Sequence, residues 1–198
     1  MASGRFLFVT YDGGGNTTPT YPLVRGLVAR GHKVAILGQP AQAEAARELG
    51  ATFAPLGLPD WTPGTSIEEQ EDVLLPLLFG PAVGEAVLEY IERDAPDVLV
   101  VDCMLTSGLA AAERSQLPAA ALVHLLYEQF VCGTTGRMWE AALPTINAMR
   151  ARFGLPPAHS PMALMDSMSL VLVACPLEFD VEMPDLPANV RYVGAIRA

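Results

Sequence analysis

Polar residues with catalytic potential follow apolar runs that are predicted to be strands. Asn16 lies in the glycine-rich turn after the first run, whereas Asp102 and His124 each end a later one. A carboxylate or a neutral imidazole can take a proton from a reacting group, and a side-chain amide can position that group. In an open parallel sheet, ligands bind beyond the carboxyl ends of the strands, where the strand order reverses. If the first and fourth strands flank that point, Asn16 and Asp102 face each other across it.

The glycine-rich turn, residues 12–18, has two interpretations. A helix that begins after it would offer free N–H groups to an anion or a polar ligand atom. A tight strand-to-helix turn also needs glycine without any ligand. A dinucleotide site is disfavoured, because the third glycine of that motif falls on Thr18 and the second strand ends at Gln39 instead of an acid. A phosphate-binding P-loop is excluded, because no Gly-Lys-Ser/Thr follows.

The other candidates also have purely structural interpretations. Asp102 could cap the helix that begins near Thr106, and His124 could be a buried histidine with satisfied hydrogen bonds. Aromatic and methionine residues in the second half of the chain could form core or the wall of an adaptable apolar pocket. We expect most of them in the core, and the pocket candidates are Tyr127, Phe130, Met138 and Trp139.

Composition limits the classes of protein that fit this chain. The 198 residues are 51% apolar and 17% charged, which indicates a folded domain rather than a disordered segment. The net charge of −10 argues against nucleic acid or a polyanionic membrane surface as a partner. The three cysteines lack metal-ligand spacing, so we expect free thiols in a reducing, cytoplasmic setting and no metal site. We recognise neither a signal peptide nor an apolar run of membrane-spanning length.

The order of the predicted elements indicates one α/β domain over residues 1–198, with a doubly wound, Rossmann-like parallel sheet. The predicted strands are 5–10, 32–38, 51–56, 97–102, 119–124, 170–175 and 190–193. The predicted helices are 18–30, 41–49, a region from 66 to 93 that Gly80-Pro81 divides, 105–115, 137–153 with a kink at Pro144, and 160–168, with 127–136 irregular. Thr18 is the predicted N-cap of the first helix, and Ser66 with Glu69 a capping box. Continuous apolar strands joined by helices are typical of a sheet covered on both faces.

Three segments, in order, resemble the N-terminal, acceptor-binding domain of the GT-B glycosyltransferases that modify natural products. The first is FVTYDGGGNTTPTYPLVRGLVARGHKVAIL, where the family usually has a Gly-His-x-x-Pro turn and a helix ending in R/K-G-H-x-V. The second is DAPDVLVVDCMLTSGLAAAERSQLPAAALVH, and the third, ACPLEFDVEMPDLPANVRYVGAI, resembles the segment that leads to the interdomain linker. In this order the resemblance runs through essentially the whole chain.

The resemblance implies a mechanism. The hydrophobic acceptor binds this domain, and a nucleoside-diphosphate sugar, carrying UDP or dTDP, binds a C-terminal domain that we expect outside this chain. A base takes the acceptor proton during an inverting attack that needs no metal or bound cofactor. The family's base is a histidine in the first turn, oriented by an aspartate that Asp102 matches. Here the histidine position is Asn16, whose amide cannot accept a proton. Asp102, then His124 or Asp12, could take the proton, or the acceptor could be acidic enough to need little help.

Two functional hypotheses result. The first is the acceptor half of a glycosyltransferase, inactive alone, in which Asp12, Gly15 and Thr17 join the four apolar candidates in binding the acceptor. The second is a non-catalytic ligand-binding or auxiliary domain of the same fold, because the family histidine is lost. The family's donor motif, His-x-Gly-x-x-Ser/Thr, is not matched in these residues. A reading frame that continues into a second Rossmann-like domain would favour the first hypothesis.

Overall fold

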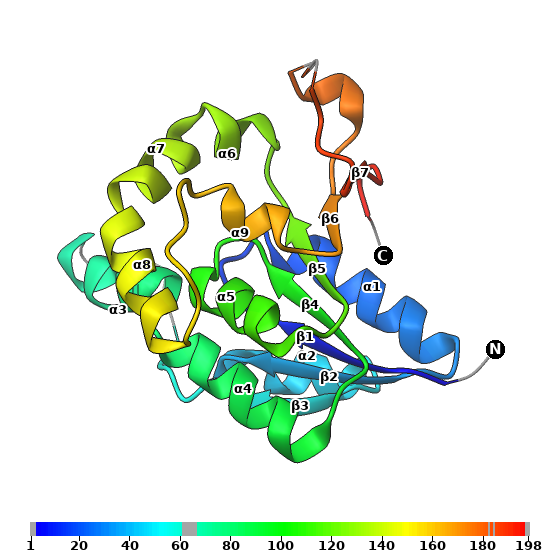
Figure 1. Cartoon of the computed structure of the whole chain (residues 1–198). Coiled ribbons are helices and arrows are strands. Elements are labelled where there is room, and N and C mark those ends of the chain that lie inside the picture. Colours follow the sequence, from blue (N-terminus) through cyan, green and yellow to red (C-terminus); the bar gives the residue numbers. More distant parts are fainter. Residues whose placement is uncertain (1–2, 61–66, 182, 184, 197–198) are drawn as a thin grey trace.

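The computed structural model describes residues 3–60, 67–181, 183 and 185–196, with the backbone alone for 67–71. In these residues the strands form one parallel sheet in the order β3-β2-β1-β4-β5-β6-β7 (Figure 1). The strands are β1 Arg5–Val9, β2 Lys33–Gly38, β3 Thr52–Pro55, β4 Val98–Asp102, β5 Ala119–Val123, β6 Leu170–Val173 and β7 Val190–Tyr192. The predicted α/β, Rossmann-like class is therefore confirmed.

Helices cover both faces of the sheet (Figure 1). They are α1 Thr17–Ala29, η1 Pro40–Gln42, α2 Ala43–Glu48, α3 Ile67–Phe79, α4 Ala82–Asp94, α5 Thr106–Ser115, α6 Glu128–Val131, α7 Thr134–Ala141, α8 Leu143–Arg152, α9 Ala163–Asp166 and η2 Leu177–Phe179. Alternate strand residues enter two apolar layers, because successive side chains of a strand point to opposite faces. Leu7 and Val9 pack into the layer with α4, α5 and α8, whereas Phe8 packs into the layer with α1 and α2.

The strand order reverses between β1 and β4. Val9 pairs with Leu37 of β2 on one side and with Val101 of β4 on the other. The connections from β1 and from β4 therefore leave the sheet beside each other at its carboxyl edge. This arrangement confirms the neighbouring strands that were predicted to bring Asn16 and Asp102 together.

Some predicted boundaries were wrong at the start of the first helix. Asn16, not Thr18, is the N-cap of α1, and Pro19 is the third helical residue. Proline fits there because the first N–H groups of a helix have no partner within it. The Thr17 hydroxyl donates to the Gly14 carbonyl oxygen at 2.8 Å and closes the turn before the helix. Of the predicted capping box, Ser66 lies outside the described residues.

The predicted break at Gly80-Pro81 is confirmed, since it falls between α3 and α4. The irregular stretch 127–136 was wrong in part, because it contains α6 and the start of α7. The helix predicted over 137–153 is divided into α7 and α8, with Pro144 in the first turn of α8. Within the described residues no single helix is long and apolar enough to cross a membrane. The helical segments Asp72–Phe79 and Ala82–Asp94, with a bend of 49° between them, are together long and apolar enough by length and composition only.

Candidate active site at the carboxyl edge

Asn16 and Asp102 are in direct contact at the carboxyl edge of the sheet. The Asn16 Nδ2 donates to Asp102 Oδ2 at 2.9 Å and to the Tyr11 carbonyl oxygen at 2.7 Å. The Asn16 Oδ1 accepts from the Gly13 N–H at 3.0 Å. Asn16 is 1% exposed and Asp102 is 2% exposed. The predicted pairing is therefore confirmed as a buried hydrogen bond.

This geometry changes the role expected for Asn16. A side-chain amide has two N–H donors, and those of Asn16 point to Tyr11 and Asp102. No amide N–H is left to hold an acceptor hydroxyl, contrary to the expectation from its polarity. Asn16 instead fastens the glycine-rich turn to the carboxylate at the end of β4.

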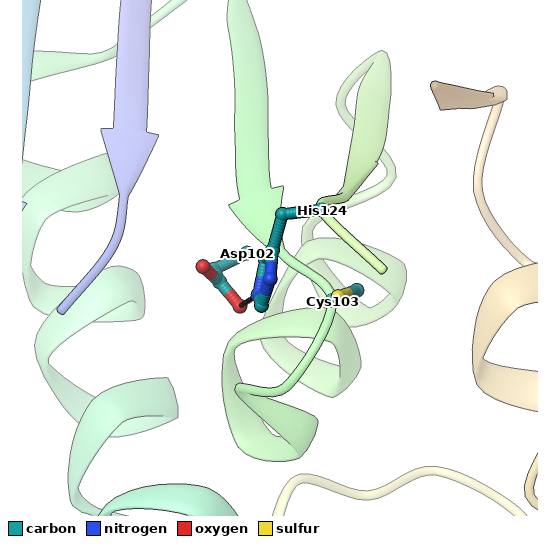
Figure 2. Close-up of side chains that lie close together, drawn as sticks. All are labelled: Asp102, Cys103 and His124. Atoms are coloured by element: carbon teal, nitrogen blue, oxygen red, sulfur yellow. Dashed lines mark hydrogen bonds and ion pairs between the residues drawn. The ribbon is translucent and has the colours of Figure 1, made fainter. Parts of the chain in front are cut away.

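The second oxygen of Asp102 contacts both a backbone amide and an imidazole. Asp102 Oδ1 accepts from the Met104 N–H at 2.9 Å and lies 3.3 Å from His124 Nε2. Figure 2 shows the His124 ring beside the Asp102 carboxylate, at the ends of β5 and β4. The structural interpretation of Asp102 is right in part, because the carboxylate closes the turn before α5. It does so at Met104 rather than at Thr106.

His124 is the member of this cluster that reaches the surface. Its side chain is 9% exposed, against 1% for that of Asp102. In the tautomer that donates from Nε2 to the carboxylate, Nδ1 carries the free lone pair. A carboxylate behind an imidazole fixes the ring orientation and stabilises the imidazolium, which suits the imidazole to general-base catalysis.

Cys103 is the third side chain of the cluster in Figure 2. Its thiol and the potential ligand atoms of Asp102 and His124 all lie within 4.8 Å of one another, a grouping that metal sites also use. Burial first, and then the Asp102 carboxylate, raise the pKa of the Cys103 thiol well above its usual range. The protonated thiol is a poor ligand, because metals bind the thiolate. The absence of a metal from the reaction stays a prediction.

The structure gives different reasons for the glycines at positions 13 and 15 of the turn. A Cβ at Gly13 would come 2.6 Å from the Tyr11 ring, so packing requires glycine there. Gly15 is exposed, its φ is not positive, and a Cβ there would meet nothing within 4 Å. Gln39 also holds the turn in place. Its Oε1 accepts from the Asp12 N–H at 2.9 Å, and its Nε2 donates to the Pro59 carbonyl oxygen at 2.6 Å. Chain packing thus explains Gly13 and leaves Gly15 open to a ligand.

Solved structures with this fold include several glycosyltransferases. The glycosyltransferase of kitacinnamycin superposes with a TM-score of 0.74 at 22% identity, covering 98% of this chain and 52% of that chain. The calicheamicin glycosyltransferase CalG4 gives 0.73 at 19%, with the same coverage. The glycosyltransferase VinC, solved with dTDP, gives 0.68 at 17%, covering 94% of this chain and 52% of that chain.

The chain has the fold of half a glycosyltransferase. It spans about half the length of the solved structures that it matches. No protein-family model matches the sequence, and no curated protein matches it. The resemblance to the N-terminal half of GT-B glycosyltransferases is confirmed at the level of the fold, which is what identities of 17–22% establish.

The apolar acceptor-binding candidates of this glycosyltransferase fold lie mostly in its core. Tyr127, Phe130 and Trp139 are at most 2% exposed, and Phe130 packs edge-to-face on Trp139 with the ring centres 5.2 Å apart. Met138 is half-buried against the same core. Phe130 also lines a hollow of about 330 Å³ next to Met162. Three of the four pocket candidates are therefore core residues, and a part for these four residues in acceptor binding stays a prediction.

A larger apolar pocket lies where the sequence indicated none. It measures about 600 Å³, within the size range of small-molecule sites, and lies between the α3–α4 junction and α8. Its lining residues are Leu75, Pro76, Phe79, Gly80, Pro81, Ala142, Thr145, Ala148, Met149 and Arg152. Asn16, Asp102 and His124 are not among them. The break predicted at Gly80-Pro81 forms part of one wall with the end of α3, but a break in a helix does not by itself indicate a pocket.

Proposed function

We propose that this chain is the acceptor-binding half of an inverting glycosyltransferase, which moves a sugar from a dTDP- or UDP-sugar to a hydrophobic natural product. The fold supports this proposal, because the matching solved structures are natural-product glycosyltransferases and one was solved with dTDP. The observation that carries it is the contact between Asp102 and His124 at the carboxyl edge of the sheet. It supplies a carboxylate-backed imidazole in a domain whose first turn has no histidine.

His124 is the proposed base, ahead of Asp102. Both oxygens of Asp102 already accept hydrogen bonds within the protein, and its side chain is 1% exposed. The acceptor hydroxyl loses its proton to His124 Nδ1 as its oxygen attacks the anomeric carbon. The new carbon–oxygen bond forms while the bond to the diphosphate breaks, and the nucleoside diphosphate leaves with the electron pair. Asp102 stabilises the imidazolium, and Asn16 holds the carboxylate in place.

The acceptor hydroxyl is placed between the exposed edge of His124 and the glycine-rich turn. Asp12, Gly15 and Thr17 of this turn are exposed or half-buried, and Gly15 is open to the approach of a ligand. Buried Tyr127, Phe130 and Trp139, with half-buried Met138, are proposed to shape the acceptor site through core packing. The donor sugar nucleotide is assigned to the other half of the enzyme, and this half is assigned no metal or bound cofactor.

Variants of the complete enzyme, this chain together with its donor-binding half, test the base. His124→Ala should lower kcat by about 10²–10⁴-fold, and Asp102→Asn should also lower it severely, with a smaller change in the acceptor KM. His159→Ala is the matched control, because His159 is exposed and makes no contact with the site in the described residues. Turnover of His124→Ala close to that of the unchanged enzyme would remove His124 from the mechanism.

The chain by itself tests the division of labour between the halves. It should transfer no sugar, and calorimetry should detect no binding of dTDP-glucose or UDP-glucose tighter than about 1 mM. Tighter binding would contradict the assignment of the donor to the other half. The non-catalytic alternative predicts that replacing His124 changes nothing but stability, so the kcat measurement separates the two functions.

A further inference from the structure

Exposed apolar side chains gather in and after the connection between β6 and β7. In the described part of the chain, five of the seven large apolar side chains classed as exposed lie between residues 177 and 193. They are Leu177, Phe179, Val181, Leu186 and Val193. Phe179 is 75% exposed and Val181 is 59% exposed. Figure 1 shows the connection extending beyond the sheet at the same end as α6. Exposed apolar groups concentrated in this way mark an interaction surface.

The segment 177–181 has an apolar outer side and a polar anchor on its inner side. Leu177, Phe179 and Val181 are exposed, whereas Asp180 is half-buried. The Asp180 Oδ2 accepts from the Tyr127 N–H at 2.5 Å and from the Tyr192 hydroxyl at 2.7 Å. This carboxylate thus ties the segment to α6 on one side and to β7 on the other.

The same carboxylate makes the segment rigid. Its Oδ1 accepts from the Val181 N–H at 2.9 Å and from the Glu128 N–H at 3.3 Å. Burial and the hydrogen bond to Asp180 raise the pKa of Tyr192, so its hydroxyl stays protonated and donates. Tyr127 follows His124 by three residues, so the apolar segment is fixed next to the connection that carries the proposed base. A preorganised surface loses less entropy on binding.

We propose that this surface, Leu177, Phe179 and Val181 with Leu186 and Val193, is where the donor-binding half docks. The proposal rests on the proposed function, since it takes a second half of the enzyme as the partner. The matching glycosyltransferases are about twice as long as this chain, so each has a further half of similar size. The surface lies at the end of the sheet that holds His124, where a sugar donor has to be presented. An apolar surface on the donor-binding half would cover it.

Charge argues against a second copy of this chain as the partner. Each copy has a net charge of −10, so two copies repel over their whole surfaces. A donor-binding half is a different polypeptide segment and does not have to carry the same charge. The Asp180 contacts then connect docking to the site. If the donor-binding half holds the segment 177–181 in place, Asp180 in turn holds the start of α6 in place.

Hydrogen exchange in a fusion tests the docking surface. This chain would replace the half of the kitacinnamycin glycosyltransferase that it matches, joined to the remaining half. Amide exchange at residues 178–181 should be at least about tenfold slower in the fusion than in the chain alone. Phe179→Asp should abolish this protection. Leu75→Asp is the matched control, because Leu75 is 46% exposed on α3 and should leave the protection unchanged.

Two results would overturn the proposal. One is equal exchange at 178–181 in the fusion and in the chain alone. The other is a chain that sediments as a dimer and becomes a monomer on Phe179→Asp, which would assign the surface to a second copy. Sugar transfer by the fusion is measured separately. Slower exchange without sugar transfer would support the docking surface and count against the proposed function. Sugar transfer without slower exchange would support the proposed function and count against the docking surface.

Discussion

Replacing Asn16 by alanine should destabilise the protein strongly, although the substitution removes only a small amide group. The substitution removes the hydrogen bonds that Asn16 makes to Asp102, to the Tyr11 carbonyl oxygen and to the Gly13 N–H. Because these groups are buried or part-buried, water does not readily replace the amide. Among the described residues, the Asp102 carboxylate keeps the Met104 N–H and His124 as partners.

The size of the effect follows from the kinds of bond that are lost. A hydrogen bond to a charged group contributes about 1.5–3 kcal/mol, and a neutral one contributes about 1 kcal/mol. We expect Asn16→Ala to lower the free energy of unfolding by about 3.5–5 kcal/mol, a large part of the roughly 5–15 kcal/mol that holds a domain folded. At roughly 2–4 °C for each kcal/mol, the melting temperature should fall by about 7–20 °C.

Urea unfolding, followed by circular dichroism, measures this loss, and Asn147→Ala is the matched control. Asn147 also bonds the backbone through both ends of its amide, at Ala158, but it has no charged partner. Its replacement should therefore cost about 1–2 kcal/mol. If Asn16→Ala costs no more than Asn147→Ala, the buried carboxylate does not depend on the Asn16 amide and the reasoning is wrong.

Three further predictions concern ionisable groups. Burial is the largest cause of a raised pKa at each of the five tyrosines. At about pH 10 the folded chain should therefore show far less tyrosinate absorbance than the urea-unfolded chain, and the stability that this protonation gives should be lost as pH rises further. Dithionitrobenzoate should modify exposed Cys132 and spare Cys103 until unfolding, because burial raises the pKa of the Cys103 thiol; equal rates would contradict this. In the complete enzyme, Asn16→His should restore part of the transfer lost in His124→Ala, since an imidazole at 16 meets the same carboxylate, and an inactive double variant would contradict that reasoning.

The sheet could be predicted because its pattern is local. Apolar runs such as 98–102 and 119–123 are buried almost throughout, and the helices α1 and α2 end beside Gly31 and Gly50. The missed helix α6 depends on a distant residue. Asp180 accepts from the N–H groups of Tyr127 and Glu128, which are more than fifty residues earlier in the chain. No pattern within 127–136 contains that information.

The site could be predicted in its topology but not in its contacts. Neighbouring strands place Asn16 near Asp102 because carboxyl ends of parallel strands meet at one edge. The direction of the Asn16 amide depends on the fold of the turn, which brings the Tyr11 carbonyl oxygen and the Gly13 N–H to it. Sequence reasoning also ranked Asp102 above His124 as the base, because burial cannot be read from residue type alone.

The position of His124 gives a physical reason for an amide at position 16. If an imidazole bonded each oxygen of the carboxylate, only one of the two rings could be protonated at a time, because two imidazolium rings at that distance repel each other. An amide on Oδ2 satisfies that oxygen without titrating, and the Met104 N–H holds Oδ1 in place for His124. Asn16 thus leaves one imidazole for one carboxylate. Under the proposed function, the base then lies at the end of β5 instead of in the connection after β1, with Asp102 behind it.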